Sequence, residues 1–186
     1  MKIAIISSSV RTGRNSHRVA LFFKNFIEEN KLGTSEILDL HLYQFPIFEE
    51  RLKFQKNPSP LAIEFAEKIT SADGVIIVTP EYNGGYPASL KNVIDLLVDE
   101  WKRKPVAIST VSAGGFAGMN VITSLQFTLW KIQAWTVSAM FPVAKVSEAY
   151  SDTGVPSDKE GTEKRAKSFI DELIWCAEAN MKMRNK

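Results

Sequence analysis

Short apolar runs alternate with amphipathic helical patterns along the whole chain, and this alternation restricts the fold more than any other feature. Strands are expected at residues 2–7, 35–40, 74–79, 105–111 and 135–146. Helices are expected around the apolar stripe of residues 19–27 and at residues 59–71, 88–98, 119–132 and 162–183. Repeated β–α alternation implies an α/β fold, with a parallel sheet covered by helices on both faces. Right-handed crossovers favour the strand order 2-1-3-4-5.

Composition excludes several classes of function. The 186 residues are 45% hydrophobic and 24% charged, which suits one globular domain with a full core. A net charge of +2, without a basic cluster among aromatic residues, predicts no nucleic-acid partner. The only cysteine, Cys176, excludes an intramolecular disulfide and is expected in the core, and His17 and His41 are too few for a histidine-rich metal centre. No apolar run suits a signal sequence or a bilayer span, so a cytoplasmic protein without membrane contact is expected.

The loop after the third expected strand has an unusual sequence, Pro80-Glu81-Tyr82-Asn83-Gly84-Gly85-Tyr86-Pro87. Gly84 and Gly85 can take backbone conformations that other residues avoid, so peptide groups can turn toward a ligand. Pro87 suits the first turn of the helix that follows. Open α/β sheets bind ligands where their strands end. A plain strand-to-helix turn with exposed aromatic residues fits the spacing equally well.

The loop after the first strand, residues 8–17, carries hydroxyl and guanidinium donors just before a helix that Asn15 or Ser16 would cap. A helix N-terminus attracts anions through its free N–H groups and its dipole. Serine and arginine side chains add donors that suit phosphate. Neither the P-loop motif nor the dinucleotide motif G-x-G-x-x-G is present. We therefore expect a mononucleotide or another phosphate monoester here.

A third loop of small residues, 112–118, follows the fourth strand. In the order 2-1-3-4-5, the ends of strands one, three and four are neighbours at the point where the strand order reverses. One ligand can therefore contact all three loops.

These loops resemble the NAD(P)H-dependent FMN reductase family, the flavodoxin-like group that includes azoreductases and quinone reductases. Residues 80–84 and 90–95 match its P-E-Y-N-G and L-K-N-A-I-D patterns, and residues 9–16 resemble its phosphate loop, G-S-x-R-x-x-S-x-N. The phosphate loop departs from the family pattern at three positions. Ser8 replaces a glycine, Arg14 replaces a serine and Ser16 replaces an asparagine.

The resemblance implies a flavodoxin-like three-layer sandwich over residues 1–186, with FMN as cofactor and NADPH or NADH as co-substrate. It implies that the FMN phosphate is held by Ser9, Arg11 and Ser16, with Arg14 and His17 near it. It also implies that the isoalloxazine is lined by Pro80, Glu81, Tyr82, Asn83 and Gly84, and that the ring is faced by Ser112, Gly114 and Gly115. No catalytic side chain and no metal are implied, because the flavin itself carries the redox chemistry.

The implied activity is electron transfer from NAD(P)H through FMN to a quinone, an azo compound, a flavin or a similar small acceptor, by a ping-pong mechanism. The alternative is a flavodoxin-type electron carrier. Such carriers typically have a first loop that resembles S/T-x-T-G-x-T, and they are typically acidic. This chain has neither feature. A binding domain of the same fold without redox function is a third reading. The resemblance also implies a homodimer or a dimer of dimers, packed through helix 88–98 and the helix that begins near Met119.

Overall fold

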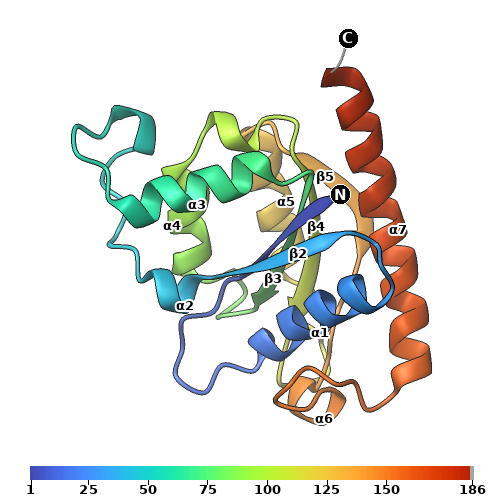
Figure 1. The fold of residues 1–186 in the computed structure, drawn as a ribbon. Helices are drawn as coiled ribbons and strands as arrows, with labels where there is room; N and C mark the ends of the chain where they lie inside the picture. The colour runs from blue at the N-terminus through green and yellow to red at the C-terminus, as the bar shows by residue number, and fades with distance from the viewer. Residues whose placement is uncertain (185–186) are drawn as a thin grey trace.

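A five-stranded parallel sheet forms the centre of the computed structural model, which describes residues 1–184 (Figure 1). The strand order is β2-β1-β3-β4-β5, as the sequence predicts. The strands are β1 (Lys2–Ser7), β2 (Thr34–Asp39), β3 (Gly74–Pro80), β4 (Pro105–Val111) and β5 (Trp135–Met140).

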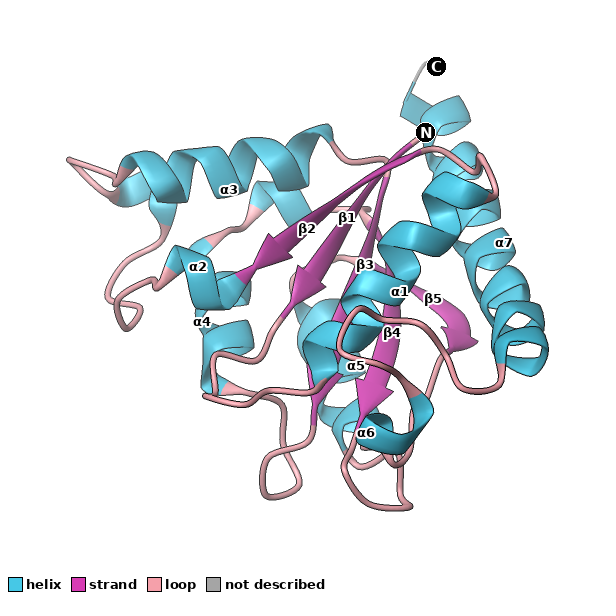
Figure 2. Ribbon diagram, turned by 60° about the horizontal axis from the view of Figure 1, so that its bottom comes forward, coloured by secondary structure: helices cyan, strands magenta, loops and turns pink. Residues whose placement is uncertain are grey.

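Helices cover both faces of this sheet (Figure 2). Helices α1 and α7 pack on one face, and α3, α4 and α5 pack on the other. The α-helices are α1 (Ser16–Glu29), α2 (Leu40–Tyr43), α3 (Pro60–Ser71), α4 (Ala88–Leu96), α5 (Val121–Lys131), α6 (Val146–Ala149) and α7 (Lys159–Arg184), with 3₁₀ turns at Leu52–Phe54 and Asp99–Trp101.

The apolar strands are buried because each face of the sheet supplies one core. Ile3 and Ile5 of β1 point into the core under α1 and α7, while Ala4 and Ile6 point into the core under α3 and α4. Cys176 of α7 is buried in the first of these cores, as expected for a small core residue. The alternation of side chains along each strand thus fixes both helical layers.

The fifth strand is shorter than the sequence suggested. It was expected to continue to residue 146 but ends at Met140, after a register irregularity in its pairing with β4. Pro142 lacks the N–H that a continuing ladder needs. Val143 still pairs with Val111 as an isolated bridge, and the chain then turns into α6. Consequently Val146 lies in α6, near the end of β4, and not in the sheet.

Two helix starts also differ from expectation. Pro87 precedes α4 and does not occupy its first turn. In the described structure, Asn15 flanks α1 without a side-chain capping bond, and the hydroxyl of Ser16 has no hydrogen-bond partner. The start of α1 is therefore left without the side-chain cap that the sequence predicted.

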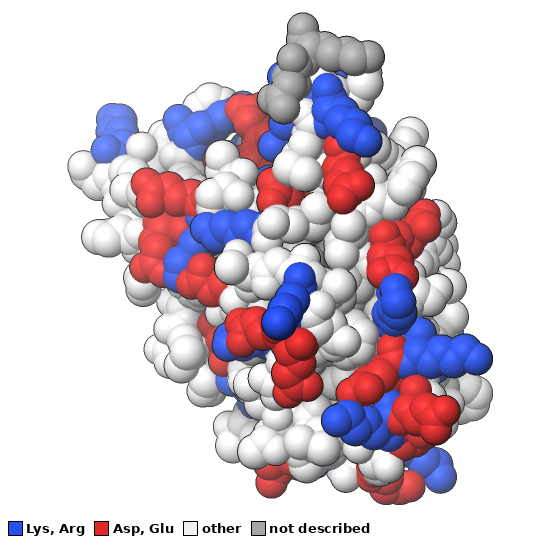
Figure 3. All heavy atoms as spheres, turned by 45° about the vertical axis from the view of Figure 1, so that its right-hand side comes forward, with Lys and Arg blue, Asp and Glu red and all other residues white. Residues whose placement is uncertain are grey.

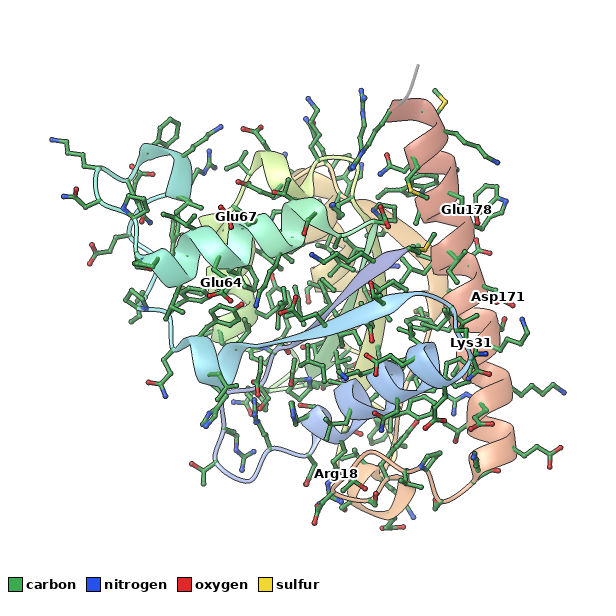
Figure 4. The ribbon with its side chains drawn as sticks, viewed as in Figure 1. Arg18, Lys31, Glu64, Glu67, Asp171 and Glu178 are labelled. Atoms are coloured by element: carbon green, nitrogen blue, oxygen red, sulfur yellow. The ribbon has the colours of Figure 1, made fainter. Side chains whose placement is uncertain are left out.

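Charges are mixed over the surface around α7, where blue and red side chains alternate (Figure 3). Lys159 pairs with Glu163 and Lys167 with Asp171, each one helical turn apart. Asp171 and Glu178 point away from the sheet (Figure 4). Within residues 1–184, no helix has the length and apolar character needed to cross a bilayer.

Candidate functional site

Three loops meet at the carboxyl ends of β1, β3 and β4 (Figure 2). They line a cavity of about 260 Å³. The convergence that the sequence predicted is therefore present. The lining residues are Ser9, Arg11, Gly13, Arg14, Asn15, Ser16, Pro80, Glu81, Tyr82, Val111, Ser112, Ala113 and Val146.

The first loop is anchored beneath the cavity by buried serines. The hydroxyl of Ser8 donates to the carbonyl of Val78 at 2.9 Å, and the hydroxyl of Ser89 donates to the carbonyl of Ser8 at 2.6 Å. Ser9 is buried, and its Oγ accepts the backbone N–H of Arg11 at 3.4 Å. These bonds hold the loop against β3 and the start of α4.

Two donors of this loop are unpaired. Arg11 is exposed and forms no ion pair with any described carboxylate. Ser16 Oγ is buried in the cavity wall, yet nothing in residues 1–184 bonds to it. A buried hydroxyl without a partner is costly and rare in native proteins, so it points to a ligand acceptor. Arg11 lines the same cavity and adds a cationic donor, so a phosphate group is the acceptor that fits these residues.

Arg14 also lines the cavity, but its guanidinium is bound to a carboxylate. It forms a two-pronged ion pair with Asp39 at the end of β2, with Nη2 2.5 Å from Oδ2, and Nη1 donates to the carbonyl of Ser9 at 2.9 Å. Burial raises the pKa of Asp39, but the bonds from Arg14 and from the N–H of His41 outweigh this and lower it overall. Arg14 thus links the first loop to Asp39 at the end of β2.

His17 lies behind the loop and is not among the described residues that line the cavity. Its Nδ1 is 3.0 Å from Oγ of Ser7 and 3.7 Å from Oδ2 of Asp39. Burial lowers the pKa of His17, the nearby Arg14 and His41 lower it further, and Asp39 opposes them. The lowered pKa makes the imidazole neutral at neutral pH.

The second loop folds back on itself at its tip. Tyr82 and Gly85 exchange backbone hydrogen bonds of 2.8 and 3.1 Å, and Asn83 and Gly84 between them have φ of 52° and 82°. Two consecutive residues with positive φ form a type I′ turn, for which Asn-Gly is the preferred pair. Asn83 and Gly84 therefore form the exposed tip, while Pro80, Glu81 and Tyr82 line the cavity.

The third loop contributes Ser112 and Ala113 to the cavity, whereas Gly114 and Gly115 are exposed beyond it. The hydroxyl of Ser112 donates to the carbonyl of Gly114 at 2.8 Å, and that carbonyl also receives the N–H of Lys145 at 3.0 Å. The carbonyl of Gly114 thus accepts two hydrogen bonds that stabilise the conformation of this loop.

Five lining residues were not predicted, namely Gly13, Asn15, Val111, Ala113 and Val146. The first four lie within or next to the predicted loops, so the loop positions in the sequence already point to them. Val146 had no such signal, because the sequence placed it in the fifth strand.

Comparison with known proteins decides the family. A family model described as NADPH-dependent FMN reductase matches residues 1–148, most of the chain. The chain belongs to the NADPH-dependent FMN reductase family. This membership confirms the predicted oxidoreductase class and the predicted cofactors, FMN with NAD(P)H.

Individual relatives agree with this family assignment. The chain is 34% identical to the NAD(P)H-dependent FMN reductase LOT6 of Saccharomyces cerevisiae over 143 residues, 69% of this chain and 73% of the relative. It is 27% identical to a quinone reductase of Pseudomonas putida over 96% of this chain and 95% of the relative. Among solved structures, the flavoenzyme NAD(P)H:(acceptor) oxidoreductase FerB of Paracoccus denitrificans superposes with a TM-score of 0.75. That alignment has 23% identity and covers 95% and 97% of the two chains, which confirms the flavodoxin-like fold class.

Proposed function

We propose that this protein oxidises NAD(P)H and passes the electrons through bound FMN to a small acceptor, such as a quinone, an azo compound or a free flavin. The main support for the proposal is that the exposed Arg11 and the buried, unbonded hydroxyl of Ser16 line the same cavity. Both belong to the segment that resembles the phosphate loop of FMN reductases.

Under this proposal, residues of all three loops would hold the cofactor. Ser9, Arg11 and Ser16 would bind its phosphate. Pro80 and Glu81 of the second loop and Ser112 and Ala113 of the third, which line the same cavity, would bind its ring. When bound, FMN supplies the redox chemistry, and the protein supplies binding, orientation and shielding from water.

The proposed mechanism is ping-pong, because we expect the three loops to leave only one face of a bound flavin accessible. Nicotinamide and acceptor would then bind at that face in turn, and the protein would contribute their orientation. A proton-transferring side chain is not required. The relatives named FMN reductase and quinone reductase support the choice of acceptor class. A cytoplasmic location without a nucleic-acid partner remains our expectation from composition.

A homodimer is part of the proposal, packed through α4 and α5. On the solvent side of α5, the rings of Phe127 and Trp130 lie 5.8 Å apart and are 62% and 65% exposed. Aromatic residues of this kind are enriched at interfaces between subunits. The helix also borders the cavity, because Asn120 precedes it and bonds to Glu81. A partner on α5 would therefore lie close to the cavity.

Rapid mixing of the flavin-loaded protein with NADPH or NADH under anaerobic conditions tests the activity. We expect bleaching of the flavin absorbance within seconds, followed by recovery on addition of a quinone. Steady-state rates over a panel of quinones, azo dyes and flavins should give parallel double-reciprocal lines. A flavin that NAD(P)H fails to reduce would favour an electron carrier. Intersecting double-reciprocal lines would contradict the proposal that NAD(P)H and the acceptor bind in turn at one face of the flavin.

A further inference from the structure

The hydroxyl of Tyr82 lies at the end of the cavity that holds the phosphate-type donors. Its oxygen is 2.5 Å from Oγ of Ser9, although the two residues follow different strands. The resemblance to FMN reductases placed Tyr82 along the flavin ring instead. The tyrosine side chain thus reaches back from the second loop to the first.

The ring of Tyr82 also lies near the side chain of Arg11. The guanidinium carbon of Arg11 lies 6.0 Å from the ring centroid, within the range of a cation–π contact. Ser9, Arg11, Ser16 and Tyr82 all line the same cavity. The tyrosine hydroxyl therefore belongs to one cluster of donors.

Counting protons shows what this cluster can offer a ligand. Two hydroxyl groups bonded to each other use one proton between them and keep the second to donate. Whichever of Ser9 and Tyr82 donates to the other, the receiving hydroxyl retains its own proton. Phosphate oxygens only accept, and hydrogen bonds to a charged acceptor are about twice as strong as neutral ones. The Ser9–Tyr82 pair therefore binds a phosphate oxygen more strongly than it binds a neutral acceptor.

We propose that Tyr82 is a phosphate-recognition residue, which acts with Ser9 as a hydroxyl pair and makes the cavity select FMN over riboflavin. The inference rests on the proposed function, because it takes a phosphorylated flavin to be the ligand. Riboflavin offers no phosphate to the pair, so its affinity does not depend on the tyrosine hydroxyl.

Titration of the flavin-free full-length protein with FMN and with riboflavin, followed by flavin fluorescence, tests this selectivity. Tyr82→Phe is expected to raise the Kd for FMN by about tenfold or more, as for a lost bond to a charged group. The Kd for riboflavin is expected to stay within about twofold of the wild-type value. Tyr86→Phe is the matched control, because the hydroxyl of Tyr86 bonds to Thr128 at 2.8 Å outside the cavity. It should leave both affinities unchanged.

A second variant tests the pair even where the first folds poorly. Ser9→Ala is expected to show the same selective loss of FMN affinity. The double variant Ser9→Ala/Tyr82→Phe should lose less than the two single losses combined, because residues in contact are coupled. Additive losses would show that the two hydroxyls act separately and would overturn the pair.

Arg11→Ala separates this inference from the proposed function. Selectivity that falls in Arg11→Ala but persists in Tyr82→Phe would leave the phosphate site in place and remove Tyr82 from it. Equal weakening of FMN and riboflavin by Tyr82→Phe would also overturn the inference, because the side chain would then serve the ring. Full selectivity for FMN in Arg11→Ala would place the phosphate outside this loop, and the proposed site would fail with it.

Discussion

The carboxylate of Glu81 accepts two hydrogen bonds from Asn120, one from the side-chain Nδ2 at 2.8 Å and one from the backbone N–H at 3.3 Å. Glu81 directly follows β3, and Asn120 directly precedes α5, so the contact joins two of the loops around the cavity. A carboxylate at a helix N-terminus is also stabilised by the helix dipole. Glu81 is therefore a positioning residue, because both of its carboxylate oxygens accept hydrogen bonds from Asn120.

Removal of this carboxylate should loosen the cavity without changing its chemistry. Glu81→Ala is expected to raise the Kd for FMN by about three- to tenfold, since it removes two modest hydrogen bonds. Glu81→Gln keeps an acceptor oxygen and should have a smaller effect. Fluorescence titration of each variant measures this, with the exposed Glu178→Gln on α7 as control (Figure 4).

The pH profile of kcat distinguishes positioning from proton transfer. For Glu81→Gln we expect a profile of the same shape as the wild-type one. Loss of a limb of that profile would make Glu81 a proton-transferring group and contradict its assignment here.

The Arg14–Asp39 ion pair should contribute to stability in a pH-dependent way. The pKa of Asp39 is lowered from its ordinary value of 3.8, so its contribution is present above that value and is lost as the pH falls through the lowered pKa. Asp39→Asn leaves the guanidinium of Arg14 without its counter-charge in a largely buried place. We expect the free energy of unfolding to fall by roughly 2–3 kcal/mol at neutral pH, less than for a fully buried pair.

Urea denaturation at neutral pH and at several acid pH values measures this difference. The gap between wild type and Asp39→Asn should narrow as the pH falls below about 4. A gap that is constant with pH would mean that the charge of Asp39 does not contribute. Glu28→Gln, which removes an exposed pair with Lys24, is the control and should change stability by less than about 1 kcal/mol.

Most of the fold follows from patterns that act locally along the chain. The order of β2, β1 and β3 follows from β–α alternation and crossover handedness, which require no knowledge of side-chain contacts. The end of β5 did not follow, because it depends on how its strand pairs with β4 near Pro142. Pairing across a sheet is tertiary, and the apolar character of residues 141–146 suggested continuation.

The candidate site shows the same division. Loop composition correctly brought Ser9, Tyr82 and Ser112 to one cavity, because parallel strands end at one edge. The partners of individual side chains were not predictable in this way. Arg14 binds Asp39 and Glu81 binds Asn120, and both contacts depend on distances between loops that are far apart in sequence.

The exposed aromatic pair of α5 gives a test of the proposed dimer. Trp130→Arg is expected to convert the dimer to a monomer, because a charge there would be buried without a partner. Trp175→Arg on α7 is the matched control, since this tryptophan is 61% exposed on a different helix. Light scattering at micromolar concentration should give the monomer mass of 20.8 kDa for Trp130→Arg only. A wild-type protein that scatters as a monomer and retains activity would contradict the dimer.

Lys104 is 1% exposed and directly precedes β4, far from the cavity. Its Nζ donates to the carbonyl of Thr70 at 3.0 Å and to that of Ala72, so it caps the C-terminus of α3. Burial lowers the pKa of Lys104 from 10.5 to about 8, with a further lowering by Arg184 and an opposing effect of Asp73. A neutral amine has two N–H groups, which match these two carbonyls, whereas the ammonium has a third.

A lowered lysine pKa makes the folded state bind fewer protons than the unfolded state between about pH 8 and about pH 10.5. The stability of the wild type should therefore rise with pH in this window, relative to Lys104→Met. We expect the unfolding free energy of the wild type, minus that of Lys104→Met, to increase by about 1–2 kcal/mol between about pH 8 and about pH 9.5. Denaturant titrations at the two pH values measure it, with the exposed neighbour variant Lys102→Met as control. A difference that stays flat or shrinks would show that Lys104 remains charged in the folded protein, because the two carbonyls at the end of α3 would then outweigh its burial.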